Sequence, residues 1–416
     1  MRSFKVLAIA IMIVGMALNL RAQKLDSIKM GPGYGNDVYY SLATGEVKQE
    51  PNSNWHIAFS TDLRSSTILT NDGTGMVLYT FPRGDTASWD TMSIEGIETW
   101  TPMFNSHDDW WNGAFDRNAL DHPDYGWGIY YQDPLAGHPI IGDSLFVIQL
   151  PDMSFKKLWI HRKHSFENYY KIQYANLDGS MDTTLMLDIK PYSSKNFAYF
   201  SFESHTLIDR EPSESWDILF TRYFDERIPY LVTGVLSNMG IEVARIEKAD
   251  TSSLGFESPE WSESRSAIGS DWKSFNMGTF VYDLADSLVF VIKDTSGVNH
   301  NLYFTEFAGS STGKVSFVTR KEEYPTNIST VFQDNMIRAY PNPTSNELYI
   351  DTDFQGSGPV GIHIYNITGR MVYSRETKNS GSGQSIFINT ESFNPGIYML
   401  QLSQEGIKAN AKIIIR

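Results

Sequence analysis

The sequence EPNSNWHIAFST at Glu50–Thr61 is repeated closely as EPSESWDILFTR at Glu211–Arg222. Each stretch is a polar turn that leads through a tryptophan into an aromatic and aliphatic segment typical of a buried β-strand. Trp55 and Trp216 are 161 residues apart, which is too far for a short solenoid repeat. The pair therefore predicts two copies of a domain-sized unit.

The similarity extends beyond these two stretches, and its elements keep the same order in both copies. The matching segments are Val38–Val47 with Phe197–Ile208, Asp143–Ile148 with Asp286–Ile292, and the strand pairs that begin at Tyr169 and Leu302. Agreement in order over such a distance indicates a duplication. The spacing from the tryptophan to the Asp-Ser-Leu segment is 88 residues in copy one and 70 in copy two, and the surplus falls within Ser93–Gln132.

Most of the chain alternates apolar and polar residues or forms short runs rich in Val, Ile, Tyr and Phe, separated by Gly, Asn, Asp and Ser. This pattern predicts an all-β fold with two tandem antiparallel β domains and a small C-terminal β-sandwich. The predicted parts are a signal peptide at 1–22, copy one at 23–190 with an expanded loop at 93–132, copy two at 191–323, a linker at 324–339 and a C-terminal domain at 340–416.

The two tryptophans are predicted to be core residues. Along a strand, Trp216, Ile218 and Phe220 would fall on one face, and Trp55, Ile57 and Phe59 would do the same.

Residues 1–22 are typical of a secretory signal peptide. Arg2 and Lys5 precede an apolar run of 13 residues, Val6–Leu18, which is too short to span a bilayer. The chain has no cysteine, so its stability must come from core burial. Removal of the three basic residues in this segment would take the formal net charge from −15 to −18. Such a surface disfavours nucleic acid and anionic lipid as partners.

The last block of the chain contains four ordered motifs. They are Tyr340-Pro341-Asn342-Pro343, Ile364–Tyr373 with Gly369 and Arg370 at its turn, Pro395-Gly396 before Tyr398, and Lys412 with Arg416 near the end. The block resembles the C-terminal sorting domain of type IX (Por) secretion cargo. The resemblance implies an Ig-like β-sandwich, an outer-membrane translocon as partner, and a secreted or outer-surface location.

The two upstream copies resemble the HmuY-like family of secreted haem-binding β proteins. Copy two carries the motifs most completely, in Tyr199–Phe202, Ser215–Arg222, Trp272, Tyr282–Val291 and Gly313–Phe317. The resemblance implies haem as a cofactor, with iron held by one side chain before the Trp-bearing strand and one after it. Copy two has no His or Met between Asp250 and Trp272, and just after Trp272 only Met277 could serve as a ligand. Copy two is therefore interpreted as a scaffold.

Copy one offers more iron ligands around the corresponding residue, Trp127. Met103, His107 and His122 precede it, and His138 follows it. Aromatic residues of the same region could line the wide apolar pocket that haem needs. These are Trp100, Trp110, Trp111, Phe115, Trp127, Tyr130 and Tyr131. In the competing interpretation, the aromatics close over the edge of a sandwich and the histidines are surface loop residues.

The run Asp108-Asp109-Trp110-Trp111 supports a different hypothesis, because carboxylates beside flat rings are also the chemistry of a glycan-binding surface. Adjacent carboxylates on one strand point to opposite faces, so they cannot flank one bond as a glycosidase pair must. The run therefore predicts a contact for a glycan or protein partner, centred on Trp110 and Trp111.

Two other motifs are interpreted as structural. Gly142–Leu145 spells the nucleophile box of a hydrolase family, but its repetition at Ala285–Leu288 indicates a recurring corner before a strand. The stretch His161–His164 is predicted to be a solvated basic turn, since its flanking Arg and Lys would repel a metal cation.

The function predicted from the sequence is that of a secreted, non-enzymatic binding or surface protein exported by the type IX system. The first hypothesis is that copy one binds haem or a related porphyrin. The alternative is a glycan- or protein-binding adhesin or structural protein without haem. No metal site beyond haem iron is expected.

Overall fold

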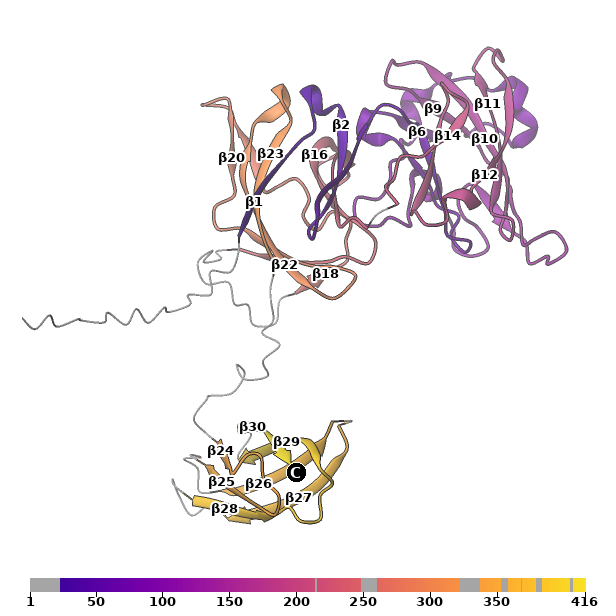
Figure 1. The fold of residues 1–416 in the computed structure, drawn as a ribbon. Coiled ribbons are helices and arrows are strands. Elements are labelled where there is room, and N and C mark those ends of the chain that lie inside the picture. The colour runs from indigo at the N-terminus through magenta and orange to yellow at the C-terminus, as the bar shows by residue number, and fades with distance from the viewer. Residues whose placement is uncertain are drawn as a thin grey trace, which may run out of the picture. The chain divides into compact units, whose positions relative to one another are not determined.

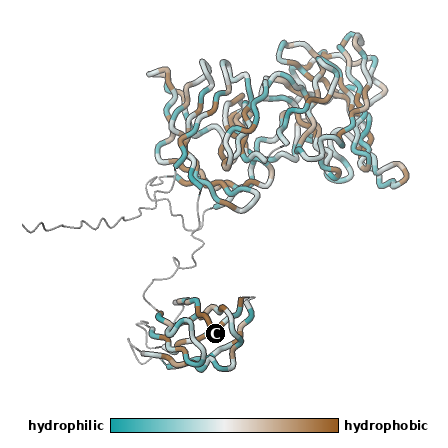
Figure 2. Tube along the Cα trace, viewed as in Figure 1, coloured by the Kyte–Doolittle hydropathy of each residue, from teal (hydrophilic) through white to brown (hydrophobic). Residues whose placement is uncertain are grey.

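A computed structural model describes residues 23–213, 215–247, 260–321, 337–352, 358–367, 369–378, 384–404 and 407–416. The predicted signal peptide and most of the predicted linker lie outside these residues. The chain divides into two compact units, residues 1–322 and 323–416. Both are built of antiparallel β-sheets, which confirms the all-β prediction (Figure 1). Figure 2 shows hydrophobic residues recurring along the strands of both units.

Four main sheets and one ribbon form the described part of the first unit. Sheet A contains β1 (Lys24–Lys29), β23 (Lys314–Lys321), β22 (Asn299–Phe307), β21 (Val289–Lys293), β17 (Glu242–Ile246) and β18 (Trp261–Ser262). Sheet B contains β16 (Tyr230–Ser237), β15 (Ile218–Asp225), β2 (Asn36–Ser41) and β3 (Gly45–Pro51). Sheet C contains β14 (Thr206–Ile208), β13 (Phe197–Ser201), β4 (Ile57–Ser60) and β5 (Ile68–Thr70).

Sheet D and the ribbon complete this unit. Sheet D contains β12 (Thr183–Asp188), β11 (Tyr169–Asn176), β10 (Phe155–His164), β9 (Leu145–Gln149), β6 (Val77–Thr80), β8 (Ile140–Gly142) and β7 (Gly128–Tyr130), and the ribbon contains β19 (Lys273–Asn276) and β20 (Val281–Leu284). Short 3₁₀ helices lie in the connections. They are η1 (Pro32–Tyr34), η2 (Asp72–Thr74), η3 (Thr86–Thr91), η4 (Ile97–Thr99), η5 (Ala114–Asp116), η6 (Lys190–Tyr192) and η7 (Gly309–Ser311).

The two sequence copies exchange strands. β2 precedes Trp55 in the chain but pairs with β15, which follows Trp216, and Tyr39 lies opposite Leu219. In return, β13 pairs with β4, and Tyr199 lies opposite Ala58 in the equivalent register. The indigo β1 likewise lies against the orange β23 (Figure 1). The strand pairing therefore crosses the predicted boundary at residue 190, with β1–β3 beside copy two and β13–β14 beside copy one.

Sheets A and B enclose one core, and sheets C and D enclose another. The first core includes Val38, Tyr40, Ile218, Phe220 and Phe317. The second includes Ile57, Phe59, Phe146, Ile172 and Phe200. In each copy, alternate residues of the exchanged strands enter these cores, as the period of two predicts.

The opposite faces of sheets B and C form what we call the seam, and both repeated tryptophans lie there. Trp216 packs edge-on against Tyr39, with ring centroids 5.1 Å apart, and Trp55 packs in the same way against Tyr199 at 4.9 Å. Trp216 clusters with Leu219 and not with Ile218 and Phe220. The prediction that Trp216 is buried is confirmed, but its predicted face was wrong. β15 begins at Ile218, so strand alternation does not extend back to the tryptophan.

The second unit is a sandwich of two sheets. One contains β24 (Ile337–Tyr340), β25 (Glu347–Thr352) and β28 (Gln384–Asn389), and the other contains β27 (Met371–Lys378), β26 (Pro359–Asn366), β29 (Gly396–Gln404) and β30 (Ile407–Ile415). Their apolar faces share one aliphatic core that includes Ile350, Ile362, Ile388, Leu400 and Ile413.

Replacing Trp216 with Ala should lower the free energy of unfolding of the first unit by about 3–5 kcal/mol, the range for deleting an aromatic core side chain. Trp216 is 5% exposed. All ten tryptophans lie before residue 273, so tryptophan fluorescence during urea unfolding reports this unit alone. The control is Trp111→Ala at a 45% exposed site, expected within about 0.5 kcal/mol of wild type. Equal losses in both variants would contradict the seam assignment.

Candidate ligand-binding groove

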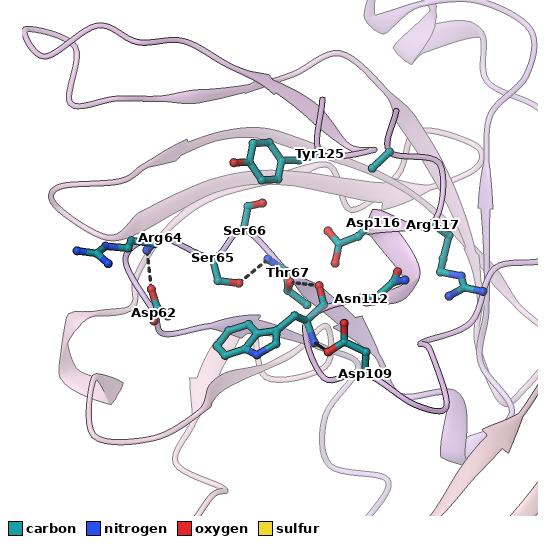
Figure 3. A pocket seen from close by; sticks show the side chains of 12 residues that line it. Asp62, Arg64, Ser65, Ser66, Thr67, Asp109, Asn112, Asp116, Arg117 and Tyr125 are labelled. Atoms are coloured by element: carbon teal, nitrogen blue, oxygen red, sulfur yellow. Dashed lines mark hydrogen bonds between the residues drawn. The ribbon is translucent and has the colours of Figure 1, made fainter. Parts of the chain in front are cut away.

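Two adjoining cavities on the first unit form one groove, because Arg64 and Tyr125 line both. Their volumes are about 640 and 560 Å³. The walls come from the β4–β5 loop, the β6–β7 connection that carries η5, and the edge of sheet D. Figure 3 shows the first cavity, with Arg64 and Arg117 toward opposite ends and Tyr125 across from Asp109. Ten of the 21 residues that line the groove belong to the expanded loop that distinguishes copy one.

The exposed indole of Trp111 lies in the first cavity on an anchored backbone. The Trp111 amide donates to Asp109 Oδ1 at 2.8 Å, and Thr67 Oγ1 donates to the Trp111 carbonyl at 2.7 Å. The indole is 45% exposed, and Asn112 also lines the cavity. A held aromatic face beside carboxylate and amide groups can bind a ligand that is apolar on one face and hydroxylated at its edges.

Asp116 lies at the inner wall of the first cavity. Its Oδ2 accepts from the Gly113 amide at 2.8 Å, whereas its Oδ1 is buried without a hydrogen-bond partner. Burial raises the pKa of Asp116 well above its ordinary value, and the nearby Asp109 charge raises it further. The neighbouring Arg117 donates to Glu226 Oε1 at 2.5 Å, which ties this wall to the β15–β16 turn.

The second cavity brings together His122 and His138. Tyr130 Oη and His138 Nδ1 are 2.9 Å apart, and Ser165 Oγ donates to the His138 carbonyl at 2.6 Å. The His122 ring lies 5.3 Å from the Tyr130 ring. Because Tyr130 occupies His138 Nδ1, the remaining ring nitrogen, Nε2, is the one left for a ligand. Apolar lining comes from Leu63, Tyr125, Ile140 and Phe166.

The other predicted iron ligands lie elsewhere. His107 is held between Asp108 and Glu226, at 3.0 Å from Nε2 and 3.1 Å from Nδ1. Met103 is buried in the core of sheets C and D. Met277 is 74% exposed in the turn between β19 and β20. None of the three lines the groove.

Most of the aromatic residues predicted to line a pocket are packed against protein instead. Trp127 and Phe115 are buried in the core of sheets C and D, and Trp100 in a smaller cluster against sheet D. Trp110 contacts both sides of the seam, and its Nε1 donates to the Ser237 carbonyl at 2.8 Å. Trp110 thus packs in the seam, whereas Trp111 lines the groove. Of the predicted aromatics, Trp111 and Tyr130 line the groove.

Lys163 positions the groove wall in a way that the sequence did not suggest. The stretch His161–His164 belongs to β10, so the predicted solvated turn was wrong. Lys163 is 1% exposed, and its Nζ donates to the carbonyls of Asp62, Leu63 and Ser65. Burial lowers its pKa to about 8. The sequence signal that could have identified this role was strand alternation, in which successive side chains of His161–His164 point to opposite faces and Lys163 faces inward.

The described residues were also compared with the requirements of a serine nucleophile, a metal site and a membrane-spanning helix. Ser144, in the hydrolase-like motif, donates from Oγ to Asp143 Oδ1 at 3.0 Å at the corner between β8 and β9. No group of three or more His, Asp or Glu side chains there is arranged to hold a metal ion. No helix in that part of the chain is long and apolar enough to cross a membrane.

The predicted sorting motifs occupy the turns and last strands of the second unit. Asn342 joins the β24–β25 turn to β30, since its Nδ2 donates to the Lys412 carbonyl and its Oδ1 accepts from the Ile414 amide, both at 2.8 Å. Gly369 has a φ of 77° in the β26–β27 turn, a conformation that favours glycine. The Tyr398 hydroxyl donates to the Asn394 carbonyl at 2.7 Å. Tyr340, Arg370 and Pro395 flank these same turns.

Residues 338–416 match the family described as secretion system C-terminal sorting domain. The second unit is a type IX secretion sorting domain. The match confirms the predicted sorting domain and indicates export to the cell surface or the extracellular space through the type IX system. The family covers only the second unit and assigns nothing to residues 23–321.

Two solved structures resemble the chain only distantly. The chain is similar to dimeric latent PorU from Porphyromonas gingivalis, at 11% identity and a TM-score of 0.16, over 84% of this chain and 31% of that chain. It is also similar to a biofilm associated protein BSP domain, at 9% identity and a TM-score of 0.15, over 95% of this chain and 66% of that chain. Neither likeness is close enough to carry an argument. No curated protein matched.

The raised pKa of Asp116 predicts a pH-dependent contribution to stability. A carboxyl whose pKa is raised by folding stabilises the protein fully below the unfolded pKa, about 3.9, and loses this contribution as pH rises through the folded pKa. Relative to Asp116→Asn, the wild type should therefore lose free energy of unfolding as pH rises above about 4 and through the raised pKa of Asp116.

Asp178→Asn is the control of opposite sign, because hydrogen bonds from Ser180 lower the pKa of Asp178. Relative to that variant, the wild type should gain stability as pH rises from acid. Urea unfolding across this range measures both slopes, and parallel curves for wild type and Asp116→Asn would contradict the assignment.

Proposed function

We propose that the first unit is a non-enzymatic glycan-binding module, which the sorting domain delivers to the cell surface or the medium. The observation that carries the proposal is the exposed, backbone-anchored indole of Trp111 within a large groove. Sugars present apolar C–H faces that pack on aromatic rings, together with hydroxyl groups that need hydrogen-bond partners. Both kinds of contact are available side by side in this groove.

The composition of the groove supports an extended ligand. Aromatic and polar side chains occur in both cavities, and the shared Arg64 and Tyr125 give a bound chain continuous contact from one to the other. The polar groups of the first cavity can both accept and donate hydrogen bonds, as hydroxyl-rich ligands require. They include Arg64, Asp109, Asn112 and Arg117.

Trp111→Ala should weaken glycan binding about tenfold or more, because central aromatic contacts carry much of the energy of an interface. A glycan array with the intact protein would identify a ligand, and titration calorimetry would then compare the variants. The matched control is Phe275→Ala, since Phe275 is 46% exposed on the β19–β20 ribbon, outside the groove. No glycan bound by the wild type, or equal losses in both variants, would overturn the proposal.

Haem or a related porphyrin is a second candidate, favoured by the finding that His122 and His138 line the same cavity. The apolar lining and the open Nε2 of His138 fit an iron porphyrin, and the guanidinium of Arg64 fits a propionate. Bound haem would supply redox or ligand-carrying chemistry. Tyr130 holds the His138 ring through its contact with Nδ1 and leaves Nε2 open, so we assign His138 as the iron ligand.

Haemin titration separates the two candidates. If haem binds here, the wild type should give a shifted Soret band, and His138→Ala should lose it because the axial ligand is gone. His205→Ala is the matched control, since His205 Nδ1 also contacts a tyrosine hydroxyl, that of Tyr174, outside the groove. An unshifted Soret band in the wild type, or an unchanged one in His138→Ala, would rule out this site.

A further inference from the structure

A small cavity lies in the seam, separate from the groove. Its volume is about 40 Å³, enough for a water molecule or a single-atom ion. The lining comes from both copies. Trp55 and Thr70 belong to copy one, whereas Tyr223 and Arg265 belong to copy two.

Four of the side chains that line this cavity carry buried donors without hydrogen-bond partners. These donors are Nε and Nη1 of Arg265, Nε1 of Trp55, Oγ1 of Thr70 and Oη of Tyr223. Arg265 is only 4% exposed. Buried polar groups in folded proteins are almost always hydrogen-bonded, because an unmet donor keeps the full cost of leaving water. Several unmet donors around one cavity therefore indicate that something accepting is bound there.

The charges at the cavity favour an anion. Arg210, which also lines it, donates to Asp37 and to Asn54 Oδ1 and so already has acceptors. Arg265 has its guanidinium 4.1 Å from the Trp110 ring. Asp72 also lines the cavity, and its Oδ2 accepts from the side chain of Asn105 at 2.9 Å. Asp72 attracts the buried guanidinium of Arg265, but three guanidiniums line the cavity against two carboxylates. They belong to Arg210, Arg222 and Arg265, and to Asp37 and Asp72.

We propose that this seam cavity binds a chloride-sized monovalent anion held by Arg265, Trp55 and Thr70. Arginine and tryptophan side chains can only donate hydrogen bonds. A water molecule there would have two acceptor positions for these donors and would need acceptors for its own two hydrogens. A halide ion accepts from every side and also balances the buried positive charge. It would link copy one to copy two.

Thermal unfolding of the intact protein tests the proposal, followed by tryptophan fluorescence at constant pH and ionic strength in sodium chloride or sodium gluconate. An anion that binds only the folded state raises the melting temperature as its concentration rises. We expect chloride to raise the midpoint of the wild type above its value in gluconate, and Arg265→Met to lose this difference. Arg320→Met is the matched control, because Arg320 is 8% exposed and also has a buried, unpartnered Nε.

Crystals of the wild type grown in sodium bromide give a second readout that does not depend on a variant folding. An anomalous bromine peak within contact distance of Arg265 and Trp55 would support the site. Water alone in the cavity, or the same chloride effect in Arg265→Met as in wild type, would overturn it. Loss of glycan or haem binding in the groove would leave this result unaffected.

Discussion

The reciprocal pairing of β2 with β15 and of β4 with β13 is the constraint on which the rest of the first unit depends. Each exchanged strand contributes one face to the core of its host copy and the other to the seam. Sheets B and C each contain two strands from copy one and two from copy two, so neither copy can complete either sheet from its own residues. This is the arrangement that a strand-exchanged homodimer takes when its two chains are fused, and it explains why the first unit forms one compact body.

The seam is less apolar than the two cores beside it, and this has energetic consequences. It contains the buried pair of Arg210 and Asp37, with Thr221 Oγ1 donating to Asp37 Oδ1 at 2.6 Å. The free energy needed to move both charges out of water offsets much of their electrostatic attraction. Removing one partner, however, leaves a buried charge without a counter-charge. Such contacts therefore do more to fix the register of the two copies than to add stability. The T-shaped pairs of Trp55 with Tyr199 and of Trp216 with Tyr39 supply the apolar part.

The all-β class, the sorting domain and the equivalence of the two tryptophan stretches could be predicted because they depend on local patterns. Strand exchange could not, since β2 is equally suited to pair with β4 or with β15, and only the three-dimensional path of the chain decides between them. The same limit applies to the candidate site. Of the four iron ligands predicted in copy one, His122 and His138 line one cavity, whereas His107 is held by Glu226 from the other copy, a contact with no sequence signal. Arg64, Tyr125 and Lys163 were missed because they are ordinary residues in their local sequence.

The expanded loop of copy one contacts copy two on one side and lines the groove on the other. One side of it fastens to copy two, where Phe104 stacks on Phe224 with ring centroids 3.6 Å apart and Trp110 donates to the Ser237 carbonyl. The other side carries Trp111, Asp109 and Tyr125 into the groove. Because the first side is held by a separate sheet, the second is presented on a fixed support, which lowers the entropy lost when a ligand binds. The insertion that distinguishes the two copies thus adds contacts between them and supplies part of the surface on which a ligand is expected.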